Sequence, residues 1–139
     1  MIENLNILEL SNVLAGPAVG MFFSELGANV IKVENKLSGG DMTRKWKLPS
    51  EKSQNTSAYF SAVNYGKKHV FLDFTNKNDR KTLESYIKKS DIIITNFKYG
   101  DAEKFKLSFE NCKALNSSII YAHIGGFKSN PKRVAFDIV

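Results

Sequence analysis

The sequence predicts a doubly wound α/β fold, in which a parallel sheet of about five strands carries flanking helices. Short apolar runs alternate along the chain with segments whose apolar residues recur at helical spacing. Turn-forming residues separate these segments. The run at 92–94 consists of three isoleucines, which is typical of a strand buried on both faces of a parallel sheet. Strands and helices that alternate in this way favour right-handed crossovers.

The first strand is expected at 7–10, and a turn follows at 11–16. Pro17 suits the first turn of the next helix, because its missing N–H costs little there. Gly27 can end that helix in the left-handed conformation. The helix spacing predicts one apolar face, formed by Val19, Phe22, Phe23 and Leu26.

A second strand is expected at 29–33, and the polar stretch at 35–57 is predicted to be a long loop. A loop of that length in a compact domain is usually functional or mobile. A short helix at 58–65 and a third strand at 70–74 come next.

The second half of the chain repeats the alternation. A fourth strand is expected at 91–95, a helix around 109–115 and a fifth strand at 118–122. A helix is expected before the fourth strand, and Thr75 or Asn76 can cap it. The apolar face of this helix comprises Leu83, Tyr86 and Ile87. Ligands of doubly wound sheets bind beyond the carboxyl ends of the strands. The segments expected at those ends are 11–16, 34–44, 96–104 and 125–128.

The composition indicates one globular domain. The 139 residues are 42% hydrophobic and 24% charged, and no apolar run is long enough to span a bilayer. The N-terminus lacks the pattern of a signal peptide. Cys112 is the only cysteine, which excludes an intrachain disulfide and fits a reducing compartment. We therefore expect a cytoplasmic protein that makes no membrane contact.

The charge balance suits an anionic partner. Twenty Lys and Arg residues against fourteen Asp and Glu give a net charge of +6, which fits nucleic acid, an anionic surface or a phosphorylated cofactor. A lysine-rich solvated surface explains the same balance. The basic residues form scattered pairs at 67–68, 88–89 and 132–133, whereas a nucleic-acid arm is denser, so nucleic-acid binding is not expected.

Several common site motifs are absent from the sequence. It contains no Gly-x-Gly-x-x-Gly after the first strand, no Walker loop and no Gly-x-Ser-x-Gly elbow. His69 and His123 are far apart and have no partner at metal-ligand spacing, so no metal site is expected. Cys112 falls on a predicted apolar helix face, where a packed thiol is the simpler interpretation.

Three groups of residues are harder to explain by packing alone. Asn96 and Phe97 end an apolar strand, Arg44 and Trp46 end the long loop, and the polar stretch 64–68 precedes the third strand. Cations, amide donors and a flat apolar surface together suit phosphates and an adenine ring. Taken singly, each group also fits a turn or a surface ion pair.

Motifs spread over the whole chain carry a specific resemblance. They lie at 8–17, 26–34, 40–44, 46, 58–60, 64–68, 72–73, 96–100, 120–122, 126–127 and 135–137. In this order and spacing they resemble the family III CoA-transferases, which include formyl-CoA transferase and carnitine CoA-transferase. The resemblance implies that 1–139 is the N-terminal, Rossmann-like, CoA-binding part of a larger enzyme.

In that family an aspartate attacks an acyl-CoA thioester, and CoA passes to a carboxylate acceptor. The resemblance also implies a homodimer of interlocked, ring-shaped chains. The nucleophilic aspartate lies downstream of the motif that begins at 136–137, so we expect this chain to lack it and to be inactive alone. Asp41, Asp73 and Asp137 are not assigned that role, and Asp73 is interpreted as a structural hydrogen-bond acceptor.

The resemblance implies particular contacts with coenzyme A or acyl-CoA, and no metal. Val13 and Leu14 would touch the pantetheine arm, and Leu72 would help to hold the adenine. The remaining implied residues are Asn96 and Phe97 lining the CoA cleft, Lys104 where the family often has an Arg for the phosphates, and Arg44 with Trp46 near the mouth.

Two alternatives stay open. The chain can be one half of a split enzyme, a CoA-binding module that pairs with a separate C-terminal piece. It can also be a fragment related to the α-methylacyl-CoA racemases, which share the fold. Those enzymes use a His just before the Asp of the last motif as acid and base, and Phe136 stands at that position here, which argues against racemase chemistry.

Overall fold

The structure is a computed structural model that describes residues 2–52, 54 and 56–135. Over these residues one sheet holds five parallel strands in the order β3-β2-β1-β4-β5. The strands are β1 (Asn6–Leu10), β2 (Asn29–Asn35), β3 (Lys68–Leu72), β4 (Ile92–Thr95) and β5 (Ile120–His123). The chain winds outward from β1 in one direction and then from β4 in the other. This order confirms the doubly wound parallel sheet and places its switch point between β1 and β4.

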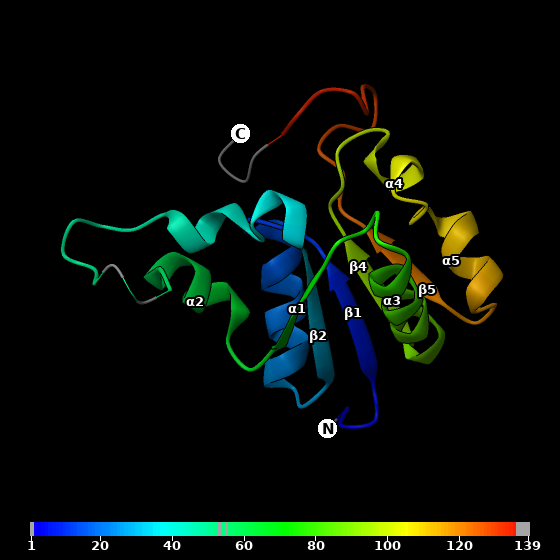
Figure 1. The fold of residues 1–139 in the computed structure, drawn as a ribbon, viewed down its shortest axis with the longest axis horizontal. Helices are drawn as coiled ribbons and strands as arrows, with labels where there is room; N and C mark the ends of the chain where they lie inside the picture. The colour runs from blue at the N-terminus through cyan, green and yellow to red at the C-terminus, as the bar shows by residue number, and fades with distance from the viewer. Residues whose placement is uncertain (1, 53, 55, 136–139) are drawn as a thin grey trace.

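Helices cover both faces of the sheet (Figure 1). The helix α1 packs on one face, and α3 and α5 pack on the other. Their bounds are α1 (Ala15–Glu25), α2 (Ala58–Asn64), α3 (Lys77–Lys89), α4 (Asp101–Lys104) and α5 (Phe109–Leu115). None of the helices in the described part of the chain has the length and apolar character needed to cross a membrane.

The larger core cluster lies under α3 and α5. Leu8 and Ile93 of the central strands meet Leu83 and Ile87 of α3, so the predicted face of that helix is confirmed. Cys112 of α5 is fully buried in the same cluster. Burial raises the pKa of this thiol to about 11, which agrees with a packed rather than reactive cysteine.

The apolar face predicted for α1 is largely exposed and is not the face that packs on the sheet. Val19, Phe22 and Leu26 are 37%, 57% and 44% exposed, and the helix instead buries Gly16, Pro17 and Gly20. Only Phe23 of the expected face packs against a core cluster. The cause lies on the facing strands, which present the charged side chains of Glu9 and Lys32 to this helix. Small residues let α1 approach them closely.

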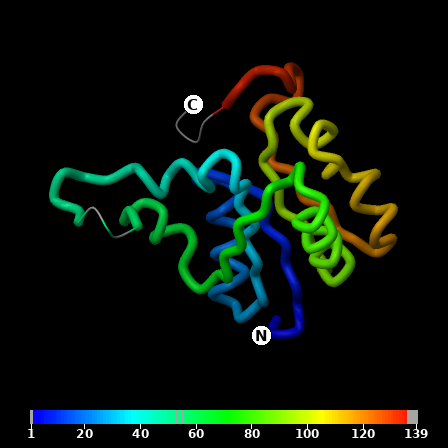
Figure 2. Tube along the Cα trace, viewed as in Figure 1, coloured from blue at the N-terminus to red at the C-terminus, as the bar shows by residue number. Residues whose placement is uncertain are grey.

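The segment at 35–57 contains local structure that the sequence did not predict. Two short 3₁₀ helices, η1 (Lys36–Ser38) and η2 (Met42–Lys45), follow β2, with Asn35 and Asp41 as their N-caps. Figure 2 shows the chain leaving the sheet after η2 and returning through α2.

Smaller differences concern β3 and α4. The strand β3 lies two residues earlier than expected, because Asp73 accepts hydrogen bonds from the Thr75 amide and hydroxyl in a turn, and Asn76 then caps α3. This confirms the structural interpretation of Asp73. The helix α4 was not predicted, and it begins after Gly100, whose φ is 85°.

Candidate functional site

The turn after β1 lies at the switch point and holds an unusual backbone. Val13 has a φ of 69°, in the left-handed region that a β-branched residue rarely adopts. Its N–H donates to Asp41, with Oδ2 at 3.2 Å and Oδ1 at 3.4 Å. Leu14 follows as the N-cap of α1 without a side-chain capping bond. The turn is therefore held from outside rather than by its own side chains.

Asn96 ties this turn to the end of β4. The Asn12 N–H donates to Asn96 Oδ1 at 2.9 Å, and Asn96 Nδ2 donates back to the Asn12 carbonyl at 2.7 Å. A Cβ at Gly16 would overlap the Ser11 side chain and lie 3.7 Å from Asn96 Cγ, so the start of α1 also approaches this amide closely. The expected site residues Val13, Leu14 and Asn96 are thus brought together.

A basic hollow of about 380 Å³ opens near the carboxyl end of β3. It is lined by Phe74, Thr75, Lys77, Arg80, Glu84, Lys104, Phe105 and Lys106. The Phe105 ring lies 5.4 Å from the Phe74 ring and 6.4 Å from the Phe97 ring, centroid to centroid. An aromatic row therefore leads from the end of β4 to the hollow, which Lys104 also lines.

The cations of the basic hollow differ in what they contact. Arg80 is held by Glu84 at 3.0 Å and donates to the carbonyls of Phe105 and Lys106 at 2.6 and 2.8 Å. Lys104 is exposed, with Nζ 5.3 Å from the Phe105 ring centroid. Arg80 therefore shapes the wall, whereas the Lys104 ammonium can reach an anion.

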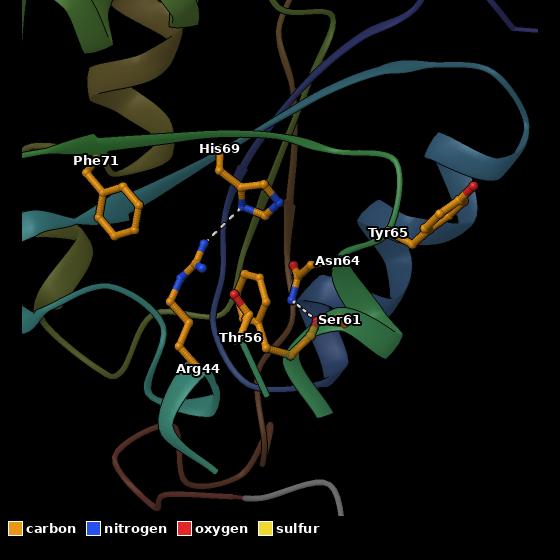
Figure 3. A pocket seen from close by; sticks show the side chains of 8 residues that line it. Arg44, Thr56, Ser61, Asn64, Tyr65, His69 and Phe71 are labelled. Atoms are coloured by element: carbon orange, nitrogen blue, oxygen red, sulfur yellow. Dashed lines mark hydrogen bonds between the residues drawn. The ribbon is translucent and has the colours of Figure 1, made fainter. Parts of the chain in front are cut away.

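Arg44 lies in a different place, an aromatic hollow of about 460 Å³ shown in Figure 3. That hollow is lined by Arg44, Thr56, Phe60, Ser61, Asn64, Tyr65, His69 and Phe71. The guanidinium donates from Nε and NH2 to the two carboxylate oxygens of Glu34 at 2.7 and 2.6 Å, and it lies 3.8 Å over the Phe60 ring. Its charge is already engaged within the protein.

Glu34 is correspondingly stabilised as a carboxylate. Burial acts to raise its pKa, but hydrogen bonds from Arg44, His69 and the Asp41 N–H outweigh that effect and lower the pKa to about 2. His69 Nδ1 lies 3.2 Å from Glu34 Oε1 and 3.4 Å from Arg44 NH2. Trp46, expected beside Arg44, packs on Tyr59 with ring centroids 5.2 Å apart.

A buried charge network connects these features, and the sequence did not predict it. Lys32 Nζ lies 2.8 Å from Glu9 Oε1 and 3.2 Å from Asp41 Oδ2, with all three side chains fully buried. Lys67 Nζ contacts Glu9 Oε2 at 2.6 Å. The available signal was the charge within otherwise apolar strands, one in β1 (Glu9) and two in β2 that are two residues apart (Lys32 and Glu34). The parallel register pairs Glu9 with Lys32, so all three side chains lie on one face.

Within the stretch at 64–68, Lys67 and Asn64 belong to this network. Lys67 also donates to the carbonyl of Pro17 at 2.7 Å and to Asn64 Oδ1 at 2.9 Å. Burial lowers its pKa to about 8, against the opposing effect of Glu9. Lys68 donates to Asn29 Oδ1 at 3.0 Å.

The structure gathers most of the expected site residues at one sheet edge. Val13, Leu14, Asn96 and Phe97 lie around the switch point, and Lys104 lies along the aromatic row from them. Leu72 is 6% exposed and belongs to the core cluster against which Phe74 packs. Sequence reasoning missed Phe74, which it placed inside the expected strand at 70–74, and it missed Phe105 and Lys106, which directly follow the expected strand-end segment at 96–104. In the described residues no cluster of His, Cys, Asp or Glu could hold a metal ion.

A family model described as CoA-transferase family III matches residues 2–139. The chain belongs to this family. A crystal structure of a CAIB/BAIF family protein from Brucella suis superimposes with a TM-score of 0.87 at 37% identity, over 96% of this chain and 36% of that one. The fold seen here is therefore that of solved relatives.

Curated relatives of this CoA-transferase family III chain carry named activities. A succinate–glutarate CoA-transferase from Agrobacterium fabrum is 35% identical over 130 residues, which is 91% of this chain and 32% of that protein. A formyl-CoA:oxalate CoA-transferase from Afipia carboxidovorans is 32% identical over 130 residues, 94% of this chain and 30% of that protein. The chain thus spans about a third of the length of these relatives.

Proposed function

We propose that this chain binds coenzyme A or an acyl-CoA, as the N-terminal part of an acyl-CoA:carboxylate CoA-transferase. The observation that carries the proposal is the continuous edge from Val13 and Asn96 along the aromatic row to the basic hollow. Its position at the switch point is where doubly wound sheets bind ligands. The two curated relatives described above are named as CoA-transferases, one for succinate and glutarate and one for formyl-CoA and oxalate.

Each part of coenzyme A has a suitable surface along this edge. The phosphates meet the Lys104 and Lys106 ammonium groups, and the adenine lies against the Phe74 and Phe105 rings. The pantetheine arm then runs past Phe97 toward the turn at Val13 and Leu14. Leu72 supports Phe74 from the core.

Arg44 enters the proposal indirectly. Its guanidinium donates to both carboxylate oxygens of Glu34, and one of these, Oε2, also accepts the Asp41 N–H at 2.8 Å. Arg44 therefore fixes the segment that contacts the Val13 turn. Asp41 and Asp73 are both engaged in internal contacts, so the proposal assigns the attack on the thioester to a carboxylate elsewhere. Asp41 is buried among donors, and Asp73 forms the turn with Thr75.

We therefore propose that the chain binds CoA without transferring it, and that the nucleophile comes from a longer chain or a separate C-terminal piece. A homodimer is the assembly proposed for the intact enzyme. The argument against the racemase alternative rests on Phe136, which lies outside the described residues, and no observation favours that alternative.

Calorimetric titration of the 139-residue chain with CoA tests the proposal. Lys104→Gln removes the phosphate contact and should weaken binding by about 1 kcal/mol, roughly fivefold in Kd. The matched control is Lys113→Gln on the surface of α5, where the Kd should not change. No CoA binding by the wild-type chain, or an equal effect of both substitutions, would contradict the proposed site. CoA transfer between carboxylates by the pure chain would contradict the assigned lack of turnover.

A further inference from the structure

We propose that Asp41 is a positioning residue that holds the Val13 turn in the conformation that receives the ligand. The proposal rests on the proposed function, because it is the CoA site at this turn that gives the conformation its purpose. The proposal has a structural half, that Asp41 imposes the left-handed backbone of Val13, and a functional half, that this conformation favours CoA binding. The structural half depends on the geometry alone.

The turn needs an external restraint. A left-handed φ of 69° is costly for the β-branched Val13, and such conformations persist only where the surroundings over-determine them. Leu14 supplies no side-chain cap to α1. The contact that restrains Val13 is its N–H bond to the Asp41 carboxylate, 28 residues away.

The Asp41 carboxylate is held in place by several contacts besides that with Val13. Its side chain is fully buried, and Oδ1 accepts from the Thr43 N–H at 3.0 Å and the Thr43 hydroxyl at 2.8 Å. Oδ2 faces Lys32 Nζ at 3.2 Å and the Val13 N–H at 3.2 Å. Every neighbour of the two oxygens is a donor, so the site fits a carboxylate and no neutral isostere.

Lys32 fixes the carboxylate relative to the turn. Its ammonium donates to the Ser11 carbonyl at 2.7 Å, and Ser11 is the first residue after β1. It is itself neutralised by Glu9 at 2.8 Å. The ammonium therefore links the start of the turn to Asp41, and Asp41 links back to Val13, which closes a ring of contacts around the turn.

Asp41→Asn breaks this ring with little change in shape. An amide offers one acceptor oxygen and an NH₂ group, so in either orientation the NH₂ opposes donors that now bind a carboxylate oxygen. The matched control is Asp91→Asn. The Asp91 carboxylate also accepts a backbone N–H, from Asn6 at 2.8 Å, but it lies at the amino ends of the strands, away from the Val13 turn.

NMR of the labelled 139-residue chain tests the structural half. The amide–Hα coupling and the amide shift of Val13 should report a positive φ in the wild type and in Asp91→Asn, and its loss in Asp41→Asn. A Val13 that keeps its left-handed conformation in folded Asp41→Asn would overturn the proposal. If Asp41→Asn does not fold, hydrogen exchange of the wild type decides instead: the Val13 amide should be protected, and exchange as fast as in an unfolded peptide would overturn the proposal.

A double-mutant cycle with Val13→Gly tests the functional half, because glycine adopts a positive φ freely. Asp41→Asn should weaken CoA binding about tenfold in the wild-type background and less than about twofold in the Val13→Gly background. An equal loss in both backgrounds would mean that Asp41 does not act through Val13. If the wild-type chain binds no CoA, the proposed function fails, and the coupling measurement alone decides whether Asp41 holds the turn.

Discussion

Lys32 Nζ lies 2.8 Å from Glu9 Oε1 on the neighbouring strand, and neither side chain is exposed to solvent. This pair places buried charge on a sheet face that also carries the buried apolar residues Ile7, Val30 and Ile94. It explains why α1 packs on that face through Gly16, Pro17 and Gly20, and it supports the Asp41 carboxylate under the turn after β1.

Glu9→Gln should be strongly destabilising. Glu9 is the carboxylate shared by the buried ammonium groups of Lys32 and Lys67, so its loss leaves buried positive charge without sufficient compensation. We expect a loss of about 3–5 kcal/mol in the free energy of unfolding, measured by urea denaturation. The control is Glu84→Gln, which breaks the half-buried i,i+4 pair with Arg80 and should cost only about 0.3–0.5 kcal/mol. Similar losses for both variants would contradict this role of Glu9.

Gly20→Ala should also destabilise the protein, although alanine is the better helix former by about 1 kcal/mol. A Cβ at this position would overlap Glu9 Oε2, and ion pairs on both oxygens prevent that carboxylate from moving away. Overpacking of this kind costs about 1–3 kcal/mol and should lower the thermal midpoint. Thr82→Ala on the exposed side of α3 should raise the midpoint or leave it unchanged. A raised midpoint for Gly20→Ala would show that α1 does not approach Glu9 this closely.

Glu34 makes stability depend on acidic pH. Its pKa is about 2 in the folded protein, against 4.5 for an ordinary glutamate, so between these values the unfolded chain binds more protons than the folded one. The Glu34 contribution is therefore complete above about pH 4.5 and is lost as the pH falls toward 2. Denaturant midpoints measured from pH 5 to pH 2 should fall less steeply in Glu34→Gln than in the wild type. Equal slopes would contradict the prediction, and exposed Glu110→Gln serves as the control.

Cys112 should react with thiol reagents only when the protein opens. Burial in the core excludes the reagent, and a pKa of about 11 leaves little thiolate at pH 8. The rate of modification should be slow in buffer and rise in parallel with urea-induced unfolding. Rapid modification of the native chain would show that α5 does not pack over the sheet as described.

The order of the elements could be predicted from the sequence because it depends on local patterns. The isoleucine run at 92–94 and the helix spacing of Leu83 and Ile87 each identify their element without reference to the rest of the chain. The buried face of α1 could not be predicted in this way, because it depends on Glu9 and Lys32 of the facing strands. Helix spacing reports which residues are apolar, and it does not report what lies opposite them.

The same distinction between local patterns and long-range contacts applies to the candidate site. The amide and aromatic pair at 96–97 could be placed from its position after a strand. The guanidinium of Arg44 could not, because its engagement by Glu34 is a contact between η2 and the end of β2 that no local pattern reveals. The left-handed backbone of Val13 was equally hidden, since it is imposed by Asp41, 28 residues away.

Mapping the binding of CoA on the ¹⁵N-labelled 139-residue chain tests the proposed site most directly. Amide shifts should change at 12–14, at 96–97 and at 104–106, in a saturable manner, while the aromatic hollow around Arg44 stays unperturbed. Shifts confined to that hollow, or no shifts at millimolar CoA, would contradict the assignment of the carboxyl edge of the sheet as the CoA site.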